Sequence, residues 1–300
     1  MELKSMTTRK SKISDDQMQL LQLPEKKPDS EPKVKVPQHP IWTENKAKLI
    51  ERYLYYFVMV THHGTYIDGF SGPQTETDSD TWTAKLVLNS EPRWLRNFFL
   101  VEQDSNQVRL LQELKTSQPK LRKRRILVYQ GDCNTIIPAL LKKHKLPEEA
   151  SFCLLDQRTT ECAWSTVSSV ASYKQENKIE IFYFLMNAWF ERTIAAVGDK
   201  RRLDAWFGNS NWNEFASMKS LERARFMCAR FRNELGYKSA KPWAIYDKPE
   251  GHGKIMYYMI HATDHLEAPK LMARAYQNAI KPKEKPEQLA LWLRVSPPEI

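Results

Sequence analysis

Glycine is scarce in this sequence, which makes the positions of the few glycines informative. Only 9 glycines occur among 300 residues. No Gly-Lys-Ser/Thr follows a segment of strand type, which excludes a P-loop, and no Gly-x-Ser-x-Gly elbow of a hydrolase is present. Two of the nine, Gly69 and Gly72, fall close together. The sequence therefore concentrates its conformational freedom in one turn.

Cysteine is also scarce, and its spacing argues against a zinc site. The four cysteines are Cys133, Cys153, Cys162 and Cys228. No Cys-x-x-Cys pair occurs, and no histidine stands at ligand spacing from a cysteine. We therefore expect no metal, and free thiols in a reducing cytoplasm.

Long apolar runs are missing as well. Met1–Arg9 has no apolar core of the kind found in secretory signals, and no run is long enough to span a bilayer. We therefore expect a cytoplasmic protein without a membrane partner.

The charge is basic. The net charge is +10, with a pI near 9.3. One cluster contains Lys120, Arg122, Lys123, Arg124 and Arg125, and a second runs from Lys142 to Lys145. Both are suited to contact the phosphates of a nucleic acid, although a solvated charged face would read the same way.

Composition predicts three regions along the chain. Residues 1–40 are rich in Pro, Lys and Ser, and we expect a disordered extension. Residues 41–280 should form one domain, with a helical insertion at about 201–236, and residues 281–300 a flexible tail. Aromatic residues gather at 206–215, either as the core of the insertion or as a base-stacking surface.

Strand and helix patterns alternate through the predicted domain. Apolar strands are predicted at 65–68, 97–101, 125–129, 152–155 and 179–185, with helices at 42–60, 105–114, 136–144 and 163–174. A hairpin is predicted at 242–261, and a last helix at 268–280. This order predicts an α/β fold with a doubly wound, mostly parallel sheet that ends in an antiparallel hairpin, the layout of class I S-adenosylmethionine (SAM) methyltransferases.

Acidic residues follow the first four predicted strands: Asp68, Glu102, Asp132 and Asp156. Ligands of such sheets bind outside the carboxyl ends of the strands. If the ligand is SAM, Asp68, Gly69, Phe70 and Gly72 would hold its amino-acid part, Glu102 its ribose and Asp132 its adenine. Each acid alone could instead cap a helix. NAD is a weaker alternative because Gly-x-Gly-x-x-Gly is missing.

Several motifs together resemble the bacterial three-Cys-motif partner protein family, a methyltransferase-like group. They are Trp42-Thr43 with Lys46, Tyr66–Pro73, Val101–Asp104, Gly131–Asn134, Leu154–Asp156, Leu185–Asn187 and Lys254–Thr263. The resemblance covers about 42–292 and implies a SAM-type Rossmann fold. It also implies a partner with a three-cysteine motif, encoded nearby.

Two departures from the family pattern bear on activity. Gln74 stands where a third turn glycine is usual, and Gln157-Arg158-Thr159 replaces Pro-Phe-Gly after Asp156. The family's loop resembles the Asp-Pro-Pro-aromatic loop of amino-methyltransferases, so Asp156 would position an acceptor amino group. Asn187 would be a second substrate contact, and Arg158 could pair with Asp156. Three functions stay open: a SAM-dependent methyltransferase acting on an amino group in nucleic acid, an inactive methyltransferase-like binding partner, and a nucleic-acid-binding module.

Overall fold

The computed structural model describes residues 40–73, 81–146, 148–248 and 253–279. The chain divides into two units, Met1–Lys35 and Val36–Ile300, and every described residue belongs to the second. The expected N-terminal extension, C-terminal tail and Gln74 lie outside the described residues.

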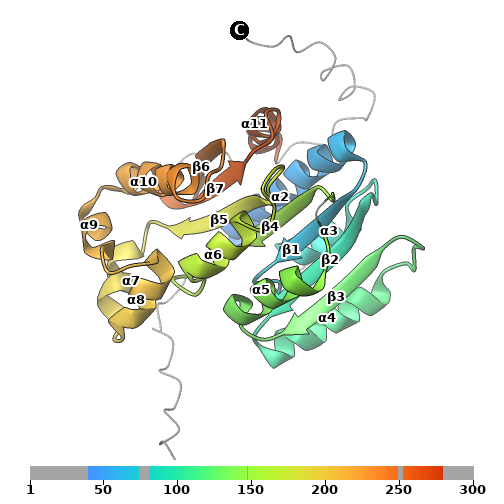
Figure 1. The fold of residues 1–300 in the computed structure, drawn as a ribbon, viewed down its shortest axis with the longest axis horizontal. Helices are drawn as coiled ribbons and strands as arrows, with labels where there is room; N and C mark the ends of the chain where they lie inside the picture. Colours follow the sequence, from blue (N-terminus) through green and yellow to red (C-terminus); the bar gives the residue numbers. More distant parts are fainter. Residues whose placement is uncertain (1–39, 74–80, 147, 249–252, 280–300) are drawn as a thin grey trace, which may run out of the picture. The chain divides into compact units, whose positions relative to one another are not determined.

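A seven-stranded sheet forms the centre of the fold (Figure 1). Its strands are β1 (Gly64–Asp68), β2 (Leu95–Glu102), β3 (Arg125–Gln130), β4 (Ser151–Leu155), β5 (Glu180–Met186), β6 (Ser239–Tyr246) and β7 (Ile255–Thr263). Their order is β3-β2-β1-β4-β5-β7-β6. The pairs among β1 to β5 are parallel, and β7 is antiparallel to both β5 and β6.

Helices connect and cover the strands (Figure 1). They are α2 (Pro40–Thr61), α3 (Thr83–Asn89), α4 (Ser105–Ser117), α5 (Cys133–Lys143), α6 (Trp164–Ala171), α7 (Phe190–Ala196), α8 (Lys200–Phe207), α9 (Trp212–Ser217), α10 (Ser220–Asn233) and α11 (Ala268–Asn278). The first helix, α2, packs against both α3 and the last helix, α11, while α5 packs against α6.

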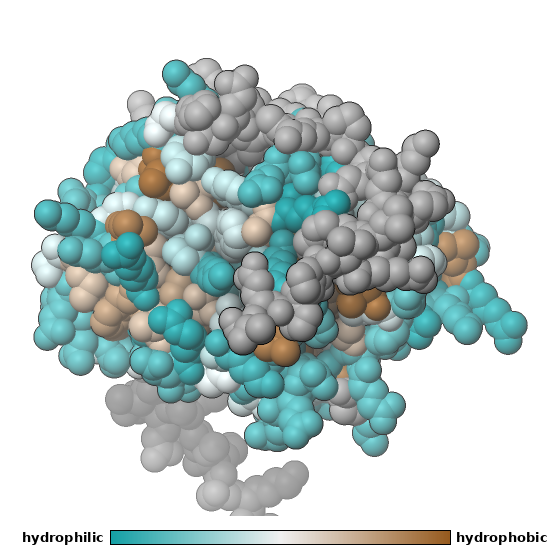
Figure 2. Space-filling view, turned by 90° about the horizontal axis from the view of Figure 1, so that it is seen from above, coloured by the Kyte–Doolittle hydropathy of each residue, from teal (hydrophilic) through white to brown (hydrophobic). Residues whose placement is uncertain are grey.

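The burial of the strands explains their apolar sequences. Every residue of β1, β4 and β5 is buried, because parallel strands between two helical layers have no solvent-facing side. By contrast, β3 is an edge strand whose residues are all half-buried or exposed. On the face seen in Figure 2, hydrophilic residues predominate and hydrophobic ones form separate spots.

The strand order and directions are those of a class I methyltransferase fold, as the sequence predicted. The reversal of chain order falls between β1 and β4, which are neighbours in the sheet. Ligands of doubly wound sheets bind at such a switch point, outside the carboxyl ends of the strands. We therefore expect a ligand-binding site among the residues that follow β1 and β4.

The helices between β5 and β6 enclose an aromatic core. Trp206, Phe207 and Phe215 are buried, with ring centres 5.4 to 6.2 Å apart. Arg230 lies 4.4 Å from the centre of the Phe207 ring and donates to its carbonyl oxygen at 2.7 Å. These rings are packed inside the helical segment, which excludes them as a base-stacking surface. No helix among the described residues is both long and apolar enough to cross a membrane.

Candidate functional site

The turn after β1 is organised around Asp68. Its Oδ1 accepts a hydrogen bond from the amide of Phe70 at 3.0 Å, and its Oδ2 accepts one from the Tyr66 hydroxyl at 2.8 Å. The Ser71 hydroxyl donates to the Asp68 carbonyl at 3.0 Å. Trp82, just before α3, donates to the Ser71 carbonyl at 2.7 Å. The turn is therefore held at both ends.

Asp68 is a buried acid with a perturbed pKa. Its side chain lies in the interior, and the residue is only 1% exposed. Burial raises the pKa of Asp68 from 3.8 to about 7, against the lowering effect of the bonds from Tyr66 and Phe70; Asp156 and Glu102 add to the rise. Asp68 is thus poised to ionise when a cation arrives.

Glu102 joins the end of β2 to the same turn. Its Oε2 accepts the amide of Gly72 at 2.9 Å, and its Oε1 accepts the amides of Gln103 and Asp104 at 2.8 and 3.0 Å. A Cβ on Gly72 would lie 2.5 Å from that Oε2 and would overlap Gln107. A side chain at position 72 would therefore have to displace Glu102 and Gln107, and three backbone amides orient the carboxylate of Glu102.

Asp132 caps α5. Its Oδ1 accepts the backbone and side-chain nitrogens of Asn134, both at 2.9 Å. Asn134 in turn receives Ala163 N and Thr166 Oγ1 at 2.8 Å, so it joins α5 to the start of α6. The helix cap that the sequence left open as an alternative is present, and Asp132 itself is exposed.

Asp156, directly after β4, forms a buried ion pair with Lys46 of α2. The Lys46 ammonium bonds to Asp156 Oδ2, and the two side chains are 3% and 10% exposed. The ammonium also lies 5.7 Å from the centre of the Tyr257 ring. Asp156 Oδ1 is buried and has no hydrogen-bond partner among the described residues. One oxygen is held and the other is left open to accept a bond.

In the loop after Asp156, Gln157 and Thr159 are buried and form hydrogen bonds within the protein. Gln157 is 1% exposed, donates to the Phe184 carbonyl at 3.2 Å and accepts Cys162 N at 2.9 Å. Thr159 N donates to Glu161 at 2.7 Å. Arg158 is exposed, and it is Lys46 that pairs with Asp156. The loop is thus stabilised by hydrogen bonds of its own polar residues.

Asn187 lies at the end of β5, where the sequence placed it. Its amide nitrogen donates to the Ile255 carbonyl at 2.9 Å, and its backbone nitrogen to the Met256 carbonyl at 3.2 Å. These bonds tie the end of β5 to the start of β7. Asn187 therefore has a structural role at this edge.

The predicted basic residues lie elsewhere. Lys120 to Arg125 lead into β3, and Arg125 is paired in register with Asn97 near the start of β2. They therefore lie at the amino edge of the parallel strands, opposite Asp68. Arg124 is turned inward, donating to the Leu88 carbonyl at 2.6 Å with its guanidinium 4.7 Å from the Phe98 ring centre. Burial, together with the nearby charge of Arg93, lowers the pKa of Arg124 to about 10.

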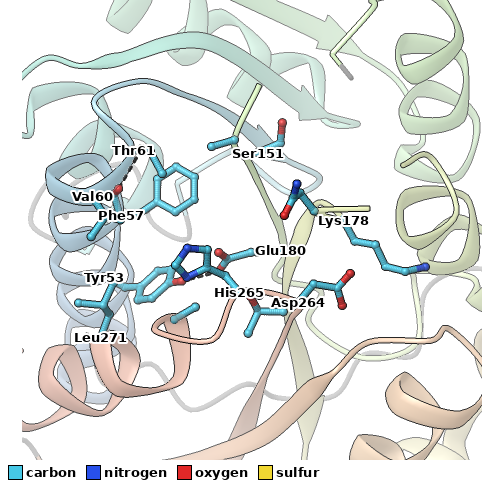
Figure 3. Close-up of a pocket in the computed structure, with 14 residues that line it drawn as sticks. Tyr53, Phe57, Val60, Thr61, Ser151, Lys178, Glu180, Asp264, His265 and Leu271 are labelled. Carbon is cyan, nitrogen blue, oxygen red and sulfur yellow. Dashed lines mark hydrogen bonds between the residues drawn. The ribbon is translucent and has the colours of Figure 1, made fainter. Parts of the chain in front are cut away.

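A cavity of about 80 Å³ opens at this amino edge too (Figure 3). It lies between α2, α11 and the ends of β4, β5 and β7, with Glu180 facing it. The Glu180 carboxylate bonds to the Tyr53 hydroxyl and to His261 Nε2, the latter at 2.8 Å. These bonds join α2, β5 and β7 across the sheet.

Lys46, Tyr66 and Tyr257 are site residues that the sequence analysis did not single out for a role. Two signals were present. Lys46 falls on the apolar stripe of α2, which continues through Ile50 and Tyr53, so a buried lysine was foreseeable. Tyr66 precedes Asp68 by two positions, and residues i and i+2 share a face of a strand. Tyr257 carried no comparable signal.

The residues at the carboxyl edge suit a cationic ligand. No group of three or more His, Cys, Asp and Glu residues that could hold a metal occurs in the described part of the chain. All four cysteines are free and buried. A buried acid with a raised pKa suits a cation.

The strand order and directions give the described domain the layout of a class I methyltransferase fold. No protein-family model matches the chain, and no curated protein matches it. Trm5b from Pyrococcus abyssi aligns with 69% of this chain and 46% of its own at 14% identity, with a TM-score of 0.34. The DszA carbon methyltransferase aligns with 67% and 47% at 14% identity and a TM-score of 0.37. The alignment thus spans about half of each of these two proteins.

The protein LPL1258 from Legionella pneumophila aligns over 79% of this chain and 94% of its own length, at 11% identity and a TM-score of 0.41. Likeness at such identity concerns the fold alone. The assignment of the fold therefore rests on the strand order and directions described above.

Proposed function

We propose that this chain is a SAM-dependent methyltransferase that acts on an amino group in a nucleic acid. The position of Asp68 is the observation that carries the proposal. A buried carboxylate with a pKa near 7 ends the strand at the switch point and adjoins the turn that contains Gly69 and Gly72. A ligand cation would favour the ionised form of this acid, and SAM carries an ammonium and a sulfonium.

Three acids would divide the recognition of SAM. Asp68, with the backbone from Gly69 through Phe70 to Gly72, would hold the amino-acid part. Glu102, already oriented by three amide groups, would accept the ribose hydroxyls. Asp132 would meet the adenine amino group from its position at the start of α5. When bound, SAM supplies an electrophilic methyl group, so the protein's task is proximity and orientation.

Asp156 would position the acceptor. Its buried Oδ1 lacks a partner and would accept an N–H from the target amino group, while Lys46 keeps the other oxygen fixed. The amide nitrogen of Asn187 is already used, so a substrate contact there would fall to its amide oxygen. The resemblance in sequence also supports a three-cysteine-motif protein as a partner.

Transfer of a labelled methyl group from SAM to RNA or DNA tests the proposal. The wild-type chain should label nucleic acid, and Asp156→Asn should lose most of this activity while it still binds SAM. An Arg109→Ala variant on exposed α4 is the matched control and should label normally. Absence of labelling on every nucleic acid tried, with and without a partner protein, would count against the proposal.

An inactive methyltransferase-like module is the second candidate, and the loop after β4 favours it. Gln157 is buried and Arg158 is exposed, so the described loop provides no aromatic residue to stack on a base. Calorimetric titration with SAM and its demethylated product, run beside the labelling assay, separates the candidates. Tight binding of both without transfer would favour the inactive module.

A further inference from the structure

Two basic clusters, connected by β3 and α5, lie close together at the amino edge of the sheet. His144, which follows α5, lies 3.0 Å from the Tyr129 hydroxyl of β3 through Nε2, and its ring is 4.8 Å from that of Phe99. The Arg125 guanidinium lies 5.7 Å from the same Phe99 ring. His144 from the end of α5 and Arg125 from the start of β3 thus lie near the same Phe99 ring.

One residue of each cluster acts on His144. The pKa of His144 is lowered first by burial and then by the charges of Arg125 and Lys143, one from each cluster. The combined surface, here called the amino-edge basic surface, consists of Lys120, Arg122, Lys123, Arg125, Lys142, Lys143 and Lys145. All seven side chains are exposed. None forms an ion pair with an acid among the described residues.

Arg124 is not part of this surface. It points to the opposite side of β3, toward Leu88 and Phe98. The only exposed acid close in sequence to the second cluster is Glu148, while Glu149 is half-buried beside His63. Near the first cluster, Leu121 is 41% exposed, and Trp94, before β2, is 36% exposed. Exposed apolar groups beside unpaired cations suit a polyanion whose bases can also be contacted.

We propose that the amino-edge basic surface binds the phosphate backbone of a nucleic acid and anchors it away from the methyl-donor site. Asn97, level with Arg125, is five residues from Glu102 along β2, or about 17 Å at the usual rise of a strand. The phosphates held on this surface would therefore lie well away from Asp68 and Asp156. A role of this surface in choosing the methylation substrate rests on the proposed methyl transfer. The binding of nucleic acid to the surface does not depend on it.

The test is fluorescence anisotropy with labelled 20-nucleotide RNA and DNA, single- and double-stranded, without SAM, at two salt concentrations. The wild-type chain should bind with an affinity that falls steeply with salt. Two separate variants, Arg122→Glu with Lys123→Glu, and Lys142→Glu with Lys143→Glu, should each weaken binding about tenfold and flatten the salt dependence. All reversed residues are exposed, so the fold should be retained.

Lys238→Glu with Lys241→Glu is the matched control, because the same charge change falls at β6, six strand spacings or about 29 Å from β3. It should bind nucleic acid nearly as well as the wild-type chain. Three results would each overturn the proposal. The control variant could lose as much affinity as the other two, only one of the two clusters could affect binding, or the chain could bind anionic vesicles but not nucleic acid. The same variants should bind SAM with the affinity of the wild-type chain. If the chain binds nucleic acid but never SAM, the proposed methyl transfer is rejected while the proposed nucleic-acid binding at this surface is retained.

Discussion

At the scale of single residues, the candidate site is defined by two acids with different surroundings. Asp68 receives two hydrogen bonds, yet burial still raises its pKa to about 7. Asp156 instead pairs with Lys46 through one carboxylate oxygen, and its other oxygen has no hydrogen-bond partner among the described residues. The first suits a group that must meet a cation, and the second suits a group that must accept a hydrogen bond.

Asp68 should make the stability of the protein depend on pH. Its pKa is higher in the folded than in the unfolded chain, so its stabilising contribution is complete below about pH 4 and is lost as pH rises through about 7. Asp68→Asn should therefore gain stability over the wild-type chain as pH increases, by up to about 1.4 kcal/mol for each unit of the raised pKa. Urea unfolding at pH 5 and pH 8 measures this; a difference that does not change with pH would contradict the assigned burial.

Gly72 should be needed for ligand binding more than for folding. In Gly72→Ala the new methyl group would displace Glu102 and Gln107, whose side chains can move at little cost. We expect the affinity for SAM to fall about tenfold, or about 1.4 kcal/mol, with little change in melting temperature. Gly198→Ala is the control, because nothing lies within 4 Å of a Cβ at that position. Unchanged affinity in Gly72→Ala would remove Glu102 from the ribose-binding role.

At the scale of elements, α2 is the helix that completes the site. It precedes β1 in the chain, yet its Lys46 reaches the residue after β4, and its Tyr53 reaches Glu180 of β5. Both contacts are between side chains more than 100 positions apart in sequence. One helix thus spans the sheet from the carboxyl edge at Lys46 to the amino edge at Tyr53.

The Lys46–Asp156 pair should show strong coupling. Lys46→Met leaves a buried carboxylate unpaired and should destabilise the protein by roughly 3–5 kcal/mol, whereas the double variant Lys46→Met with Asp156→Leu should cost clearly less than the sum of the two single changes. Chemical unfolding of the four proteins gives the coupling energy. The exposed Arg109–Glu113 pair is the reference and should show less than about 1 kcal/mol. Additive effects at Lys46 and Asp156 would show that the pair is not formed.

The elements were predictable because their patterns are local. The expected strand at 65–68 is β1, the expected helix at 42–60 is α2, and the predicted hairpin is β6 with β7. The acids after each strand followed from the same patterns. The partner of Asp156 did not, because it is brought there by the packing of α2 across the sheet, which local periodicity does not specify. Of the two alternatives for the aromatic residues at 206–215, the core of the helical segment is the one found for Trp206, Phe207 and Phe215, which pack against one another.

At the scale of the whole domain, the common direction of the parallel strands separates a group of acidic side chains from a group of basic ones. Acidic groups collect at the carboxyl edge, with Asp68, Glu102 and Asp156 close enough for the last two to raise the pKa of the first. The exposed lysines and arginines of the amino-edge basic surface collect at the opposite edge, around His144. The sequence showed both sets of residues but not that they are kept apart, because that depends on all five parallel strands running the same way.

The central claim is that Asp68 must be ionised to hold a cationic SAM, and calorimetric titration from pH 6 to pH 8 tests it most directly. Below its pKa of about 7, binding must release the proton of Asp68, so affinity should fall about tenfold for each unit of decreasing pH and level off above pH 7. Asp68→Asn should bind SAM much more weakly and without this pH dependence. Failure of the wild-type chain to bind SAM at millimolar concentration, or binding whose affinity is the same at pH 6 and pH 8, would contradict the account.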